Sequence, residues 1–169
     1  PTIAYVSGDD LLPTVADRIA RRELMNFETG EPITDASAYL TANAYLGCWG
    51  IVEALEQGAD IVITGRATDA AIVCGPAAWH HGWSRSDYNQ LAGAVTADHV
   101  IECSTQATGG NYSFFHEIPD MIHPGFPWAE VADDGSSVIG KHEGTGGEVN
   151  VGTVTSQLLY EIDSPSYLG

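Results

Sequence analysis

The chain has 169 residues, which is about one domain and enough to bury a hydrophobic core. Its 23 acidic residues and six Lys and Arg residues give a net charge of −17. This balance excludes a general electrostatic mode of nucleic-acid binding, which needs Lys and Arg to displace counterions from phosphates. An acidic, Lys-poor composition is also what adaptation to high salt predicts, and we treat that as a hypothesis. No run approaches the roughly 18 apolar residues of a membrane span, so we expect no membrane segment.

The first part of the chain predicts one strand and two helices. Residues 2–6 are a short apolar strand, and residues 11–24 have the apolar spacing of a helix. A longer helix is predicted over residues 36–57. Gly47 and Gly50 within it weaken the helix by about 1 kcal/mol each relative to alanine, which indicates a close-packed neighbour.

A second strand and two more helices follow. Residues 60–64 contain three β-branched apolar residues in a row, which is typical of a buried strand. The next helix is expected to reach about residue 81, with Thr68 or Asp69 as its cap and an interruption at Pro76. Residues 88–106 predict another helix.

The last part of the chain predicts a hairpin and a helix. Residues 128–131 and 137–141 flank a turn at Asp133-Asp-Gly135, and a helix over residues 151–162 begins after Asn150. This order of elements predicts an α/β fold. We expect a mainly parallel sheet flanked by helices, with a small hairpin or α+β appendage. The strands 2–6 and 60–64 should lie parallel in one sheet, covered by the helices 11–24 and 36–57.

We expect residues 1–169 to form a single α/β domain that is a fragment of something longer, because the first residue is Pro1. The three cysteines, Cys48, Cys74 and Cys103, are far apart and form no Cys-x-x-Cys pair. We therefore predict a reduced, cytoplasmic protein with buried thiols. The histidines show none of the usual ligand spacings, so we predict no metal site and no cofactor.

The segment after the strand 60–64 predicts an anion site. A loop between a parallel strand and a helix N-terminus is where open α/β sheets place ligands, and its free N–H groups favour an anion. Gly65, Arg66 and Thr68 are the candidate binding residues, and Asp69 is a candidate acid or base. The alternative is that Arg66 only pairs with Asp69 or Asp60. The spacing matches neither the dinucleotide fingerprint nor the P-loop.

Two further glycine-rich loops are candidates for ligand contact. One contains Gly109, Gly110 and Asn111, and the other contains Thr145, Gly146 and Gly147. Glycines let backbone N–H groups approach a phosphate or carboxylate closely. They are equally common as ordinary turn formers. We expect both loops to converge with Arg66 on one cleft.

Two other residues are candidates for proton transfer. Glu102 lies near the end of an apolar helix, where burial raises a carboxyl pKa and favours a role as an acid or base. The alternative is a solvated helix glutamate. His142 lies beside two glycine turns, and Cys103 is a nucleophile only if a base such as His142 activates it.

Longer strings of residues resemble a known family. They are Ala42-Asn-Ala-Tyr-Leu-Gly47, Trp49-Gly-Ile-Val-Glu-Ala-Leu55, Gly58-Ala-Asp-Ile-Val-Ile-Thr-Gly-Arg66, Gly75-Pro-Ala-Ala-Trp79, His99-Val-Ile-Glu-Cys103, Gln106-Ala-Thr-Gly-Gly-Asn-Tyr-Ser113, Lys141-His-x-Gly-Thr-Gly-Gly147 and Gln157-Leu-Leu-Tyr-Glu-Ile162. Together these strings resemble the acyclic terpene utilisation family, long catalogued as a conserved domain of unknown function. The likeness spans nearly the whole chain. Members of that family are longer than this chain.

The resemblance implies a place in catabolism. The family is named for the breakdown of citronellol and geraniol, whose intermediates travel as coenzyme A thioesters, and its members occur beside acyl-CoA carboxylases and hydratases. It implies a protein that binds or acts on an acyl-CoA thioester or a branched carboxylic acid, in a hydratase or lyase step. The only cofactor group expected is the coenzyme A moiety of the substrate. The alternative is a non-catalytic binding or scaffold subunit of an acyl-CoA enzyme complex. We expect a homo-oligomer, with acyl-CoA-processing enzymes as possible partners.

Overall fold

The computed structural model describes residues 1–162 of the chain, which divides into two compact units. The first unit covers Pro1–Thr68 and the second begins at Asp69. The expectation of one domain over residues 1–169 stays a prediction.

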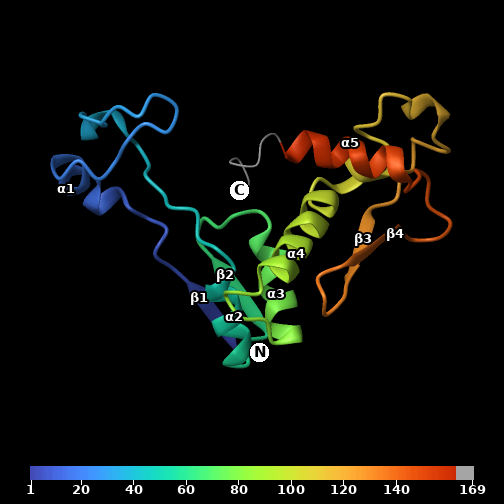
Figure 1. Ribbon diagram of the computed structural model, residues 1–169, viewed down its shortest axis with the longest axis horizontal. Helices are drawn as coiled ribbons and strands as arrows, with labels where there is room; N and C mark the ends of the chain where they lie inside the picture. Colours follow the sequence, from blue (N-terminus) through green and yellow to red (C-terminus); the bar gives the residue numbers. More distant parts are fainter. Residues whose placement is uncertain (163–169) are drawn as a thin grey trace. The chain divides into compact units, whose positions relative to one another are not determined.

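The first unit is built on two parallel strands, as predicted. Strand β1 (Ile3–Val6) pairs with β2 (Ile61–Thr64), as Figure 1 shows. In this pairing Ile3 lies opposite Ile61. The unit also contains two 3-10 helices and two α-helices, which are η1 (Leu12–Thr14), α1 (Val15–Ala20), η2 (Ala36–Ala38) and α2 (Trp49–Glu56). Helix α2 packs against both strands, whereas α1 packs against η1 and η2. Of the two helices that were expected to cover the sheet, α2 packs on it and α1 packs elsewhere.

The long helix predicted over residues 36–57 is wrong over most of its length, because α2 begins only at Trp49. The preceding backbone is hydrogen-bonded to the loops that follow the two strands. The N–H of Ala44 donates to the carbonyl of Asp9, and the N–H of Leu46 donates to the carbonyl of Arg66. These long-range bonds replace the bonds of a helix. The helix predicted over residues 11–24 is likewise shorter, and ends at Ala20.

One of the two glycines predicted to mark a close neighbour does so. A Cβ atom added at Gly50 would collide with the side chain of Val6 on β1. A Cβ atom added at Gly47 would meet no atom within 4 Å. The contact of α2 with β1 therefore requires glycine at position 50 only. The buried face of α2 comprises Ile51, Val52 and Ala54.

The second unit packs two α-helices and a hairpin around α4. Its elements are α3 (Ala71–His81), α4 (Tyr88–Ile101), η3 (Ser104–Thr108), η4 (Phe115–Glu117), β3 (Pro127–Val131), β4 (Ser137–Lys141) and α5 (Val151–Glu161). Helix α4 contacts α3, α5 and both strands (Figure 1). Its buried face includes Ala94, Ala97 and Val100, whose small side chains let the neighbouring elements approach closely. The predicted hairpin is confirmed, with antiparallel β3 and β4.

Two predicted features of α3 are corrected, and the predicted cap of α5 is confirmed. Helix α3 runs through Pro76 without interruption, although the proline removes one backbone hydrogen bond. Its N-cap is Ala70, and no side chain caps it, so neither Thr68 nor Asp69 has that role. Helix α5 has the predicted cap, because the Asn150 side chain accepts a hydrogen bond from the N–H of Thr153.

The described residues therefore form a mixed helix and strand fold with two small sheets, one parallel and one antiparallel, each of two strands. A larger parallel sheet is not found within residues 1–162. None of the helices in this part of the chain has the length and apolar character needed to cross a bilayer.

Candidate functional site

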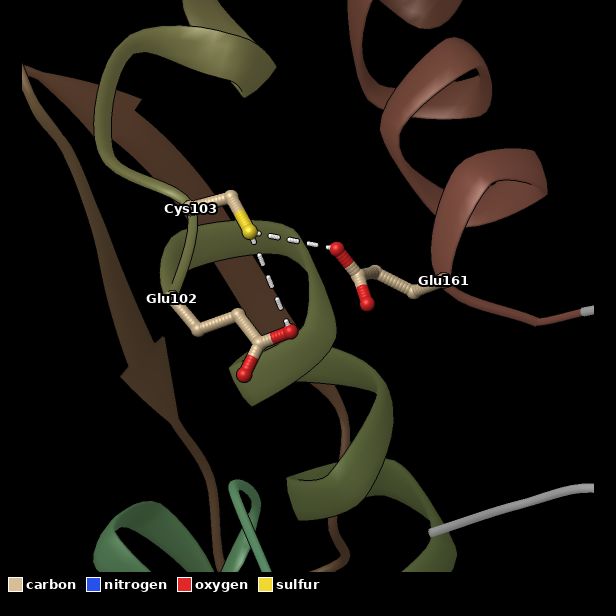
Figure 2. A group of neighbouring side chains, drawn as sticks. All are labelled: Glu102, Cys103 and Glu161. Carbon is tan, nitrogen blue, oxygen red and sulfur yellow. Dashed lines mark hydrogen bonds between the residues drawn. The ribbon is translucent and has the colours of Figure 1, made fainter.

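Three polar side chains meet where the C-terminal ends of α4 and α5 approach each other. The Sγ atom of Cys103 lies 3.2 Å from Oε1 of Glu161 and 4.0 Å from Oε1 of Glu102. Figure 2 shows Glu102 and Cys103 at the end of α4 and Glu161 across from them on α5. We refer to Glu102, Cys103 and Glu161 as the carboxylate–thiol cluster. Their potential ligand atoms all lie within 4.8 Å of one another.

Helical spacing and helix packing together assemble this cluster. Asp98 and Glu102 are four residues apart at the end of α4, so they share one face of the helix. Gln157 and Glu161 have the same spacing on α5. The packing of α4 against α5 brings the two faces together. The cluster therefore depends on the tertiary packing of two helices, each of which carries a pair of polar residues spaced four apart.

The amide of Gln157 fixes the position of Glu161. Its Nε2 donates to Oε1 of Glu161 at 3.1 Å and to the carbonyl oxygen of His99 at 3.0 Å. Its Oε1 accepts a hydrogen bond of 2.6 Å from Nδ2 of Asn111. Because Gln157 is fully buried and bonded on both sides, it holds the Glu161 carboxyl in one orientation toward Cys103.

Asp98 is a buried carboxyl group whose negative charge is unfavourable for folding. Its side chain is 0% exposed, and neither carboxyl oxygen has a hydrogen-bond partner among the described residues. Burial, together with the negative charges of Asp69 and Glu161, raises the pKa of Asp98 to about 7. A buried carboxylate without a partner costs folding free energy unless something neutralises it.

Glu102 has the raised pKa that its position in the sequence predicts. Burial is the largest cause, followed by a carboxyl–carboxyl hydrogen bond with Glu161 and by the negative charges around it, and together they raise the pKa of Glu102 to about 7. The charged groups that act on it are Glu161, Asp69 and Asp98. Glu102 is half-buried, so it is not the fully solvated glutamate of the alternative interpretation.

Cys103 is held as a neutral thiol. Burial, a hydrogen bond to Glu161 and the negative charges of Glu161 and Glu102 raise the pKa of the thiol to about 11. The side chain of Gln157 acts in the opposite direction and is the weaker influence. The thiolate is the nucleophilic form of cysteine, so this environment suppresses direct thiol attack.

Of the three predicted acid–base residues, Asp69 acts electrostatically on Glu102. Asp69 is exposed immediately before α3, and its charge raises the pKa of both Asp98 and Glu102. His142 lies in the exposed turn after β4, where its carbonyl accepts a hydrogen bond from Thr145. The groups that act on Glu102 do not include His142. A catalytic role for each of the three stays a prediction.

The predicted anion loop already holds an anion of the protein itself. The N–H of Arg66 donates to Oδ2 of Asp9 at 2.9 Å, and this bond is the main reason that the pKa of Asp9 is lowered. A Cβ atom added at Gly65 would overlap the same carboxylate. The N–H of Thr68 donates to the carbonyl of Leu46. The loop is thus tied to the loop after β1.

The Arg66 side chain is exposed, and its guanidinium lies 5.6 Å from the centroid of the Tyr45 ring. The Asp60 carboxylate, one of the two partners of the alternative interpretation, accepts a hydrogen bond from the N–H of Thr2. Whether Arg66 and the two glycine loops line one cleft involves both units and stays a prediction.

The glycine loops of the second unit are bonded internally. The N–H of Gly146 donates to the carbonyl of His123, and the N–H of Gly147 donates to the carbonyl of Pro119. The N–H of Gly109 and of Gly110 donate to carbonyls of η3. The Thr145 hydroxyl donates to the carbonyl of His142. Protein acceptors therefore use these donors, and the expected anion-binding roles stay predictions.

Asn111 is the residue of these loops that reaches the cluster, through its bond to Gln157. Sequence reasoning did not include Glu161, Gln157 or Asp98 in the site. The spacing of Asp98 with Glu102 and of Gln157 with Glu161 was the available signal. Each pair lies four residues apart on a helix, but only the packing of the two helices shows that the pairs face each other.

The fold and the cluster define a mixed α/β protein with a half-buried carboxylate–thiol centre. The model of the family described as "Acyclic terpene utilisation family protein AtuA" matches residues 1–169. The chain therefore belongs to the acyclic terpene utilisation family. No curated protein and no solved structure matches the chain.

Proposed function

We propose that this chain carries the reaction centre of an enzyme that acts on an acyl-CoA thioester or a related branched carboxylic acid in catabolism. The step is of the hydratase or lyase type. The observation that carries the proposal is the pairing of the Glu102 and Glu161 carboxyl groups beside Cys103. The family name, with its reference to terpene utilisation, supports the substrate class.

The chemistry follows from the arrangement of the carboxyl groups. A hydratase or lyase moves a proton at a carbon next to a carbonyl and adds or removes a small group such as water. Glu102 is the proton-transferring group in this proposal, and Glu161, oriented by Gln157, holds the other end of the shared hydrogen bond. Asp69 adds negative charge near Glu102.

The first experiment identifies a ligand of the full-length protein by thermal shift, using a panel of acyl-CoA thioesters and free branched acids. A ligand that binds only the folded state stabilises it by about 2.7 kcal/mol at a hundredfold excess over its Kd. Each ligand that raises Tm is then incubated with the protein, and mass spectrometry follows the gain or loss of water.

The decisive variant is Glu102→Gln, which keeps the shape of the side chain and removes its acid–base function. The expected result is a kcat about 100 to 10,000 times lower, with ligand-induced stabilisation retained. Glu130→Gln is the matched control, because Glu130 is an exposed glutamate on β3. Full turnover by Glu102→Gln would refute the proposal.

A non-catalytic binding or scaffold subunit is the second candidate. It is favoured by the exposed aromatic side chains of Phe114, Phe115 and Phe126 in the second unit, which are suited to contact with another protein. The same incubation separates the two candidates. A thioester that raises Tm and keeps its mass after prolonged incubation supports the binding subunit.

A further inference from the structure

The carboxylate–thiol cluster contains the donor atoms of a metal site. Glu102 and Glu161 offer carboxylate oxygens and Cys103 offers sulfur, and these atoms lie within 4.8 Å of one another. The donors come from the ends of two packed helices, so their separation is set by the fold and not by a flexible loop (Figure 2). Donor atoms around a tetrahedral Zn²⁺ ion lie about 3–4 Å apart, so separations of up to 4.8 Å are close to those of a metal site.

The charges around the cluster favour a cation. Asp98 and Asp69 both act on Glu102, and Asp98 also interacts with Glu161. The neutral amide of Gln157 bonds Glu161 from α5. Carboxyl groups gathered this closely repel one another when ionised, and a divalent ion removes that repulsion more completely than a single shared proton does.

Asp98 provides an independent observation. It lies one helical turn before Glu102 on the same face of α4, is 0% exposed, and has two oxygens without a hydrogen-bond partner in the described part of the chain. Its spacing of four residues from Glu102 places it on the side of α4 that carries this cluster, and it is close enough to interact electrostatically with both Glu102 and Glu161. A buried carboxylate with free acceptor oxygens beside a ligand set can serve in the outer shell of a metal site, where it accepts a hydrogen bond from metal-bound water.

We propose that Glu102, Cys103 and Glu161 bind a divalent transition-metal ion of the zinc class, with Asp98 as an outer-shell carboxylate. The thiol selects a borderline ion such as Zn²⁺ over Mg²⁺ and Ca²⁺, which prefer oxygen donors throughout. The thiol proton leaves to solvent as the sulfur binds. Three protein ligands leave a position for water or a substrate oxygen, as in catalytic zinc sites. The inference does not depend on the proposed function, and it gives Glu102 a different role, as a metal ligand in place of the proton-transferring group.

The test measures binding of Zn²⁺ alone and of Co²⁺ alone to the intact, chelator-treated protein, without any substrate. Calorimetry should give about one Zn²⁺ per chain. With Co²⁺, binding should produce the sulfur-to-cobalt charge-transfer absorption that requires a thiolate ligand. Bound cobalt without this absorption would overturn the proposal even if every variant failed to fold.

Variants then assign the ligands. Cys103→Ser should abolish the charge-transfer absorption, and Glu161→Gln should weaken Zn²⁺ binding at least about tenfold. Glu130→Gln removes an exposed carboxylate of the same unit and should bind as the wild type does. Circular dichroism checks that each variant is folded. Equal weakening in all three variants, or none in Glu161→Gln, would assign the binding to the acidic surface and overturn the proposal. Because no substrate is used, this result is separate from the test of turnover.

Discussion

Asp98 shows at the scale of one residue how this unit accepts an unfavourable group. It is fully buried on α4, and the charges that act on it, those of Asp69 and Glu161, are negative. Its pKa is raised from 3.8 to about 7, so the cost of the charge is absent below pH 3.8, grows as the pH rises and is complete above pH 7. Such local conflicts are expected at functional sites more than elsewhere.

The first prediction follows from this sign. Asp98→Asn should stabilise the chelator-treated protein at pH 8 by about 1–3 kcal/mol, because it removes a buried negative charge and its repulsion. The gain should disappear near pH 4, where Asp98 of the folded wild-type protein is protonated and carries no charge. Urea denaturation at the two pH values measures it. A gain that is the same at both values would contradict the role of charge.

Asp9 gives the opposite pH dependence. The N–H of Arg66 and the amide of Asn43 bond its carboxylate and lower its pKa below 3.8. The stability from these bonds is therefore present above pH 3.8 and lost as the pH falls through the lowered pKa of the folded state. Asp9→Ala should lower Tm at pH 7, and the difference from the wild type should shrink toward pH 3. A difference independent of pH, in melts followed by circular dichroism, would contradict this account.

At the scale of elements, the sequence was sufficient where local bonds decide the structure. The capping interaction of Asn150 and Thr153, and the hairpin of β3 and β4, depend on neighbouring residues, and both were predictable. The pairing of β1 with β2 was also predictable, because short runs of β-branched apolar residues are typical of buried parallel strands. The conformation of residues 39–48 was not, because its backbone bonds are to distant loops.

In the candidate site too, features set by local sequence were predictable and features set by tertiary packing were not. The raised pKa of Glu102 was predictable from its place near the end of an apolar helix. The identity of its partner Glu161 was not, because it depends on the packing of α4 against α5. In the same way, the loop holding Arg66 was recognisable as an anion-binding loop. That the anion is the carboxylate of Asp9 depends on a contact between residues far apart in the sequence.

The contact of α2 with β1 gives a prediction at this scale. Gly50→Ala should destabilise the protein by about 1–3 kcal/mol, because the added methyl group overlaps Val6 and this cost exceeds the gain in helix propensity. Gly47→Ala is the matched control and should change stability by less than about 0.5 kcal/mol, since open space surrounds that position. Chemical denaturation of both variants tests the pair. Equal effects would show that the close approach is not at Gly50.

At the scale of the whole molecule, the net charge of −17 dominates. Repulsion between 23 acidic residues disfavours the compact state at low ionic strength, and salt screens it. The free energy of unfolding should therefore rise with KCl concentration. Unfolding by urea at several KCl concentrations measures this effect, and stability that does not rise with salt would reject adaptation to high salt.

The expected homo-oligomer stays a prediction, which light scattering at micromolar concentration tests.

The central claim is that the ends of α4 and α5 hold Glu102 and Glu161 against each other. The most direct measurement is a double-mutant cycle of Glu102→Gln, Glu161→Gln and the double variant, by urea denaturation of the chelator-treated protein at pH 8. Because either substitution relieves the same repulsion, the double variant should gain less stability than the sum of the single variants. The coupling energy should be at least about 0.5 kcal/mol. Strict additivity would show that the two carboxyl groups are not neighbours, and would contradict the site described for this protein.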